Sequence, residues 1–397
     1  MIQMPNPFKY GTIVTGEDFA DRKEELQLLT RELTSGQNIL LYSPRRYGKS
    51  SLMMMVLKEL QKQNIITALV DLYGCLSLSD FIGKLVEKTV VPAYSTVDSM
   101  MIFLKSALSG FAPEVTVNPD GSVKLSYRKE ASQIAEKDLS EVLDASEKLA
   151  KTKNKRLVVV FDEFQEIVNL DGARVEHLMR TVFQHHKLVT YVFMGSKRHL
   201  LEQMFNDANR PFYKFAKPFP LGKIPVKEFS SFIRAKFEKT KISIHSSIVD
   251  SILKFTEGHP YFTQELCHEI WNLSCDKGHV EKDDIERAKT DILRMQNDLF
   301  VRMWDKMTIP QRKLLVAISE ERQISAIYST SFIERYGLIS SSHVLRSVNQ
   351  LMTEGIIERA NGDYSIPDIF LREWVIAKTT SDESRLHKPK ISDIPHS

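Results

Sequence analysis

The sequence predicts an α/β domain with a parallel sheet and helices on both faces, followed by an α-helical region and a winged helix-turn-helix domain. Short apolar runs alternate with helical patterns in the first part of the chain, which is typical of buried parallel strands. The run 39–42 leads into a glycine-lysine-serine sequence and then into a helical pattern. From about residue 223 the spacing is helical, and a hairpin pattern follows near residues 356–366.

The composition allows a globular chain of about two to three domains. The 397 residues are 42% hydrophobic and 26% charged, and the formal net charge of +3 is too small to indicate a nucleic-acid or membrane partner. The cysteines Cys75, Cys267 and Cys275 lack metal-ligand spacing, and such a sparse, odd set suits a reducing compartment. No apolar stretch approaches bilayer length and no leader pattern is present, so a cytoplasmic location is expected.

An extended lead-in (1–20) and a helix (21–35) precede the first strand, which ends at the octapeptide Ser43-Pro44-Arg45-Arg46-Tyr47-Gly48-Lys49-Ser50. A helix is expected from Ser51. This is the context that a phosphate-binding P-loop needs, because the loop N–H groups and the helix N-terminus face the anion. We therefore expect residues 43–51 to bind ATP, with Lys49 on the β- and γ-phosphates and the Ser50 hydroxyl on Mg²⁺. Ser43 replaces the first glycine of the motif, and an accidental Gly-Lys-Ser is the alternative.

Further apolar runs continue the sheet pattern at 65–70, 157–161 and 189–194, with a shorter one near 219–221. Helices are expected at 81–91 and 139–149. Between them, 114–117 and 122–127 alternate around an Asn-Pro-Asp-Gly turn, which predicts a hairpin insert at about 112–130. The insert is either a plain surface elaboration or a contact surface for another subunit or partner.

The third apolar run ends at Asp162-Glu163, as in a Walker B element. At the carboxyl end of a strand, Asp162 can hold Mg²⁺ and Glu163 can polarise the water that attacks the γ-phosphate. A helix-capping acid pair after a core strand is the alternative interpretation. Coupled to an upstream P-loop, the pair predicts nucleotide hydrolysis.

Three more polar residues are candidates for the hydrolytic step. Ser196 and then Arg198, at the end of the fourth run, are the choices for a group that senses the γ-phosphate, and an N-cap serine in a solvated turn is the alternative. Arg210 could stabilise charge across a subunit interface in a self-associated form, although an arginine in such a place more often makes a local salt bridge.

These motifs resemble a known family. The segments 19–26, 43–50, 161–166 and 195–198, with Glu257-Gly258-His259-Pro260 further on, are similar to the prokaryotic "archaeal ATPase" family of AAA and STAND-type P-loop ATPases. The resemblance covers about residues 6–374. It implies that residues around Phe19 and Arg22 line the adenine pocket and that the turn at His259 and Pro260 approaches the nucleotide. A helix C-cap at Gly258 followed by a new helix explains the same turn without a ligand.

Four regions are predicted: a P-loop ATPase domain (1–222), a helical lid (223–303), a winged-helix domain (304–377) and a disordered tail (378–397). The winged-helix pattern comprises three helices and a hairpin with an Asn-Gly turn. Residues 308–376 contain seven Lys or Arg and eight Asp or Glu. DNA-binding modules normally gather cations, so a protein-contact or packing role is favoured over DNA binding.

The sequence therefore predicts an ATP-binding and ATP-hydrolysing molecular switch that uses Mg²⁺, in which the nucleotide state re-sets the lid and the winged helix. A protein partner is expected but not identified by the residues. The alternatives are a DNA-associated ATPase, whose winged helix grips duplex, and a nucleotide-gated scaffold that does not hydrolyse ATP.

Overall fold

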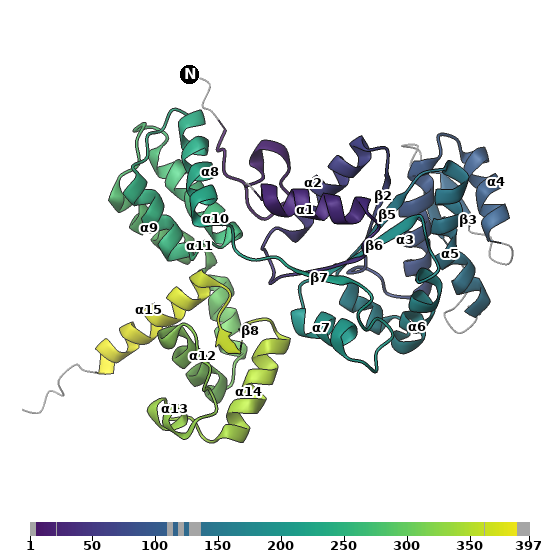
Figure 1. Ribbon diagram of the computed structural model, residues 1–397. Helices are drawn as coiled ribbons and strands as arrows, with labels where there is room; N and C mark the ends of the chain where they lie inside the picture. Colours follow the sequence, from purple (N-terminus) through teal and green to yellow (C-terminus); the bar gives the residue numbers. More distant parts are fainter. Residues whose placement is uncertain are drawn as a thin grey trace, which may run out of the picture. The chain divides into compact units, whose positions relative to one another are not determined.

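The computed structural model describes residues 5–20, 22–108, 114–117, 123–126, 136–360 and 362–386, which form two compact units (Figure 1). The sheet unit consists of Lys9–Phe232 together with the short segment Gly258–Tyr261. The helical unit contains the segment that ends at Phe8, then Ile233–Glu257, and the chain from Phe262 on.

The sheet unit contains a five-stranded parallel sheet, as the sequence predicts. Its strands lie in the order β2-β5-β6-β1-β7, so the P-loop strand β1 is flanked by β6 and β7. Strand β5 pairs with β2 and β6, which brings the ends of β5, β6 and β1 to one edge of the sheet. The strands are β1 (Ile39–Tyr42), β2 (Ile66–Asp71), β5 (Leu157–Asp162), β6 (Val189–Gly195) and β7 (Lys217–Pro220).

Alternate side chains of these strands fill two separate cores, one on each face of the sheet. Ile39 and Leu41 pack with α1 (Lys23–Thr34) and α2 (Lys49–Lys62), whereas Leu40 contributes to the larger core on the opposite face. The helices of the larger core are α3 (Leu78–Val90), α4 (Val97–Ala107), α5 (Glu136–Lys153), α6 (Gly172–Phe183) and α7 (Arg198–Asn206). The prediction of helices on both faces is therefore confirmed.

The insert between β2 and β5 is partly described. Strands β3 (Glu114–Val117) and β4 (Val123–Ser126) pair antiparallel, with Glu114 opposite Ser126, which confirms the hairpin, and the intervening turn lies outside the described residues. Helix α4 was not predicted, although Thr96 caps it by accepting from the Ser99 N–H. The described part of this unit also contains three short 3₁₀ helices, which are η1 (Gly16–Asp18), η2 (Val91–Ala93) and η4 (Phe164–Asn169).

The helical region begins with α8 (Val226–Lys239), α9 (Ser246–Thr256), α10 (Pro260–Ser274) and α11 (Lys282–Lys306). The predicted winged-helix elements follow as α12 (Ile309–Glu321), α13 (Thr330–Arg335), α14 (Ser341–Thr353), β8 (Glu358–Ala360) and β9 (Asp363–Ser365). Helix α15 (Ile369–Leu386) is an addition that was not predicted. It corrects the start of the predicted tail, because the chain from 378 to 386 holds no proline or glycine that would end the helix; residues 387–397 lie outside the described part.

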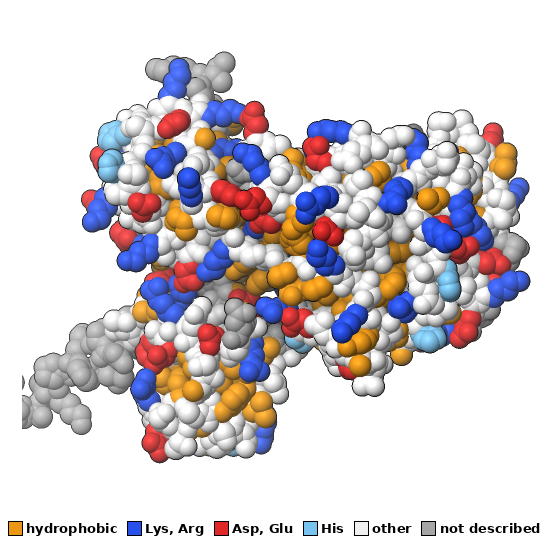
Figure 2. Space-filling view, viewed as in Figure 1, with side chains coloured by type: hydrophobic (Ala, Val, Ile, Leu, Met, Phe, Trp, Pro, Cys, Tyr) orange, Lys and Arg blue, Asp and Glu red, His pale blue; other side chains and the backbone are white. Residues whose placement is uncertain are grey.

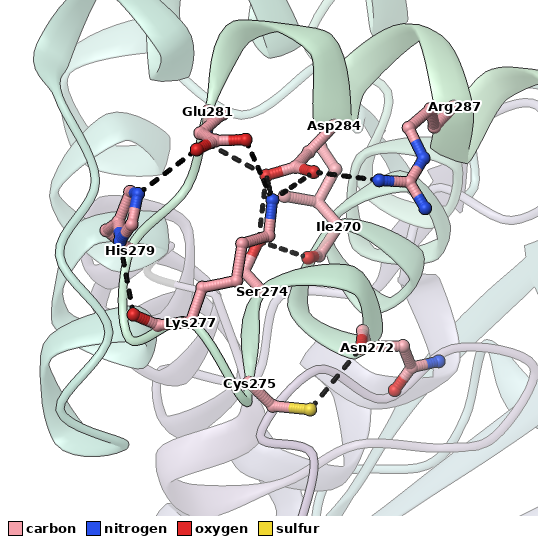
Figure 3. A network of polar contacts seen from close by, with 9 residues as sticks. All are labelled: Ile270, Asn272, Ser274, Cys275, Lys277, His279, Glu281, Asp284 and Arg287. Atoms are coloured by element: carbon pink, nitrogen blue, oxygen red, sulfur yellow. Dashed lines mark hydrogen bonds and ion pairs between the residues drawn. The ribbon is translucent and has the colours of Figure 1, made fainter.

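A buried carboxylate organises the connection between α10 and α11 (Figure 3). The Asp284 side chain accepts from the Ser274 hydroxyl at 3.2 Å, the Lys277 ammonium at 2.8 Å and the Glu281 N–H at 2.8 Å. Burial raises the pKa of Asp284, but the hydrogen bonds from Lys277 and from the Glu281 backbone outweigh it and lower the pKa overall. The network caps α11 and explains the charges here without a ligand.

Within the described ranges, no helix has the length and apolar character needed to cross a membrane.

Candidate functional site

The octapeptide forms a loop between the carboxyl end of β1 and the first turn of α2. Gly48 is the N-cap of α2 and has φ 84°, a left-handed conformation that glycine adopts without strain. Arg46 is also left-handed, with φ 66°. Ser43 does not have a positive φ, and its hydroxyl donates to the Pro44 carbonyl at 3.0 Å. The loop geometry therefore does not require glycine at the first position.

Lys49 lies inside this loop with only 7% of its surface exposed. Its ammonium donates to the carbonyls of Ser43 at 3.0 Å and Pro44 at 3.1 Å, and to the Ser43 hydroxyl at 3.2 Å. Burial lowers the pKa of Lys49 to about 8, although the nearby carboxylates of Glu163 and Asp162 favour its charged form. A desolvated cation held by neutral carbonyls is suited to receive a phosphate, because the anion would supply the missing countercharge.

Ser50 and Asp162, the two residues predicted to bind Mg²⁺, contact each other directly. The Ser50 hydroxyl donates to Asp162 Oδ2 at 3.2 Å. Burial, and then the neighbouring carboxylate of Glu163, raise the pKa of Asp162 to about 6. A hydroxyl and a carboxylate oxygen fit Mg²⁺. Among the described residues no group of three or more His, Cys, Asp or Glu could hold a metal, so phosphate and water would complete the shell.

Glu163 has a left-handed backbone, with φ 49° and ψ 46°, which is uncommon outside glycine and asparagine. Its carboxylate oxygen Oε2 accepts from the Ser196 hydroxyl at 2.9 Å and from the Ser196 N–H at 3.3 Å. Glu163 precedes η4 but makes no side-chain cap, and the Asp162 side chain accepts from the Glu163 N–H at 2.9 Å. The structure therefore brings Glu163 and Ser196 together across neighbouring strands rather than using Glu163 as a helix cap.

The turn at Gly258 lies against the P-loop, within the sheet unit. Gly258 has φ 67°, and the His259 ring meets the Tyr47 ring edge-on at 4.6 Å between centroids. The Arg46 guanidinium lies 4.3 Å from the centre of the Tyr261 ring, one residue after Pro260. His259 is 5% exposed, and burial together with the cations of Lys223 and Arg46 lowers its pKa to about 3. His259 is therefore a buried neutral ring and not a surface histidine.

Four predicted site residues have local partners in this structure. Arg22 is 2% exposed and donates to the carbonyls of Tyr47 at 3.2 Å and Gly222 at 2.8 Å, so it hydrogen-bonds directly to the backbone of the P-loop. Phe19 is half-buried against the core formed by α1 and α2. Arg198 donates to Glu202 at 2.8 Å, and Arg210 pairs with the buried Glu176, which is the local salt bridge considered as its alternative.

Sequence reasoning missed two contributors to this region. Tyr261 and Tyr10 meet edge-on at 5.6 Å, so the aromatic side of the P-loop is larger than the motif indicates. Gln165 is 3% exposed and donates its amide to Glu163 Oε2, although it lies in the segment that carries the Walker B pattern. The position of Gln165 two residues after Glu163 could have marked it as a candidate site residue. The direction of its side chain, however, depends on the left-handed backbone of Glu163.

Two family models match this chain. One is described as an ATPase domain predominantly from Archaea and matches residues 19–266. The other is described as a probable winged helix domain and matches residues 298–377. No curated protein matches the chain.

Solved structures with the same fold include two archaeal proteins. The Walker-type ATPase of Pyrococcus abyssi is 19% identical with a TM-score of 0.63, and the match covers 93% of this chain and 99% of that one. The ORC2 protein of Aeropyrum pernix, solved as ADPNP and ADP complexes, is 13% identical with a TM-score of 0.54, covering 92% and 95%. At these identities the likeness concerns the fold alone.

Proposed function

Because the chain belongs to the family of ATPase domains found predominantly in Archaea, we propose that it is a Mg²⁺-dependent molecular switch that binds ATP at residues 43–51 and hydrolyses it. Family membership makes the chain an ATP-binding ATPase; the Walker assignments and the switch are our proposal. The observation that carries it is the convergence of Lys49, the Ser50–Asp162 pair and the Glu163–Ser196 pair at one edge of the sheet. That edge is where ligands bind in parallel sheets.

Each of these groups has a role in the proposed reaction. The Lys49 ammonium would exchange its carbonyl partners for the β- and γ-phosphates, and Ser50 with Asp162 would hold Mg²⁺, which would supply charge stabilisation to the phosphates. Glu163 accepts a proton from the attacking water. Ser196 holds Glu163 by hydrogen bonds from its hydroxyl and its N–H. The pocket thus separates binding groups from the group that activates water.

Phosphate release from Mg·ATP tests the hydrolytic part of this proposal. Glu163→Gln should bind ATP with the wild-type affinity and lose turnover by about 10²-fold or more, because an amide cannot accept the proton. Glu166→Gln is the matched control, since Glu166 lies on the same short helix and pairs with Lys197 at 3.0 Å. Equal loss of binding and turnover in Glu163→Gln would indicate a structural acid instead.

The contacts of the Gly258–Tyr261 turn support the switch part of the proposal. Tyr47 and Arg46 belong to the loop that would bind phosphate, and their ring and cation contacts are with His259 and Tyr261 at the start of α10. Phosphate binding draws the loop toward the anion and so changes these contacts. Trp271, in the same helix, is a natural fluorescence reporter, and its indole N–H donates to Thr240 at 2.9 Å. Mg·ATP should change its emission in the wild type, and Tyr47→Ala should weaken that change.

For the winged helix we propose contact with a protein partner. The exposed face of α14 carries Leu345, 48% exposed, and Arg346 beside it, while Arg359 of the wing lies 5.2 Å from the centre of the Tyr364 ring. Acidic and basic side chains are interspersed over the face shown in Figure 2. A duplex needs clustered cations. Binding to duplex DNA at two salt concentrations tests this, since tight, salt-sensitive binding lost in Arg346→Ala would favour the DNA-associated alternative.

A further inference from the structure

We propose that Gln165 is a positioning residue for ATP hydrolysis, which anchors one oxygen of the Glu163 carboxylate and leaves the other oxygen to accept the proton of the attacking water. This inference rests on the proposed function. In that reaction the water oxygen bonds to the γ-phosphorus, the bond to the β–γ bridging oxygen breaks, and ADP leaves with the electron pair. The proton of the water goes to Glu163 Oε1.

The donors to Glu163 come from two elements and meet at a single oxygen. Gln165 Nε2 donates to Oε2 from η4, and the hydroxyl and N–H of Ser196 donate to the same Oε2 from the end of β6. Every hydrogen bond that the described part of the chain gives to this carboxylate ends on Oε2. A carboxylate held in this way has a fixed rotamer, and its Oε1 keeps its lone pairs for water.

The orientation of the Gln165 amide is itself informative. Its Nε2 faces the carboxylate, so its Oε1 is turned the other way, where this buried atom has no hydrogen-bond partner among the described residues. Leaving a buried amide oxygen unpaired is unfavourable, and such atoms in native structures call for an explanation. The hydrogen bond to Glu163 is that explanation, because the Gln165 amide can donate to the carboxylate only when its Nε2 faces Glu163.

Gly195 gives the amide its space. A Cβ atom built on Gly195 would lie 2.0 Å from Gln165 Oε1, closer than any real contact. Gly195 has an ordinary extended backbone at the end of β6, so the close approach of Gln165 accounts for glycine here and backbone strain does not. Three features therefore orient one carboxylate: the left-handed backbone of Glu163, the buried Gln165 amide and the absence of a side chain at Gly195.

The experiment compares kcat and the KM for ATP in the full-length wild type and Gln165→Met, with ATP affinity measured separately by titration of a non-hydrolysable analogue. Methionine keeps the length and burial of the side chain but cannot donate. We expect kcat to fall by about ten-fold to 100-fold, with analogue affinity unchanged within two-fold. Gln264→Met is the matched control, since Gln264 is a buried glutamine of α10 whose amide oxygen also has no partner among the described residues. An unchanged kcat, or an equal loss of affinity, would overturn the inference.

A double-mutant cycle separates positioning from packing. If Gln165 acts through Glu163, then adding Gln165→Met to Glu163→Gln should lower single-turnover hydrolysis by less than about two-fold. A further ten-fold loss of single-turnover hydrolysis in the Glu163→Gln protein would show that Gln165 acts independently of Glu163, which would contradict the inference. If Glu163→Gln alone retains full turnover, the proposed function fails. If Glu163→Gln loses turnover and Gln165→Met keeps it, only this inference fails.

Discussion

Replacing Lys49 with methionine should stabilise the nucleotide-free protein and remove its response to ATP. The Lys49 ammonium is buried in the P-loop, and that burial lowers its pKa from the ordinary 10.5 to about 8. Because the folded-state pKa is the lower one, the charge opposes folding fully below about pH 8, and this penalty disappears only as the pH rises from 8 to 10.5. At pH 7 the lysine is charged in both states, so the full penalty applies.

The pKa difference sets the magnitude. A drop from 10.5 to about 8 corresponds to a penalty of about 3 kcal/mol. The hydrogen bonds from Lys49 to Ser43 and Pro44 would be lost in the variant. The Pro44 carbonyl keeps the Ser43 hydroxyl as a donor, whereas the Ser43 carbonyl loses the Lys49 ammonium, at a cost of roughly 1 kcal/mol. The net expectation is a gain of about 2 kcal/mol, which corresponds to a rise in Tm of about 4–8 °C for a unit of this size.

Thermal unfolding with and without Mg·ATP measures both effects. At 100 times the Kd, a ligand raises the wild-type stability by about 2.7 kcal/mol, whereas Lys49→Met should show no such protection. Lys58→Met is the control, because Lys58 lies on the same helix but is exposed. The reasoning is refuted if Lys49→Met unfolds at a lower temperature than the wild type without nucleotide, or if ATP protects it as it protects the wild type.

Three other perturbations follow from the same geometry. Asp162→Asn should raise the Mg²⁺ concentration needed for half-maximal turnover, because it removes the carboxylate charge but keeps the contact with Ser50; an unchanged Mg²⁺ titration would contradict this. His259 has a folded-state pKa of about 3, below its ordinary 6.5, so the unfolded state binds the extra proton between these values. The wild type should therefore lose stability relative to His259→Phe by roughly 1.4 kcal/mol per pH unit as the pH falls from 6 to 4, measured by urea unfolding. Gly195→Ala should fold with a small loss of Tm and reduce kcat as Gln165→Met does, because its methyl group displaces the end of the Gln165 side chain; full activity in this variant would show that the amide can move without consequence.

Much of the site was predictable because it depends on short-range sequence and on strand order. The P-loop residues are contiguous, and Asp162 follows an apolar strand directly. Ser196 meets Glu163 because β5 and β6 are adjacent parallel strands whose carboxyl ends coincide. Hydrophobic patterning also predicted β1, β2, β5 and β6, since buried parallel strands are continuous apolar runs. The edge strand β7 is mostly exposed, and only the short apolar piece near residues 219–221 indicated it.

The contacts that sequence reasoning could not supply depend on packing between distant segments. Arg22 donates both to the Tyr47 carbonyl of the P-loop and to the carbonyl of Gly222, which lies 200 residues away from Arg22 in the chain. Arg210 finds Glu176 on a neighbouring helix, which no spacing rule specifies. Helix α15 was also not predicted from the sequence: the Asp368 side chain accepts from the Leu371 N–H at 3.0 Å and caps the start of this helix.

The turn after α9 is held by contacts on both sides of one peptide bond. Glu257 and Gly258 both have left-handed backbones, with φ 53° and 67°. Before the peptide bond that joins Glu257 to Gly258, the Glu257 carboxylate accepts from the guanidinium of the buried Arg372 at 2.8 Å. After it, the His259 ring meets the Tyr47 ring of the P-loop edge-on. A non-glycine residue in this conformation persists only where its surroundings hold it. The ion pair to Arg372 and the ring contact to Tyr47 are such restraints.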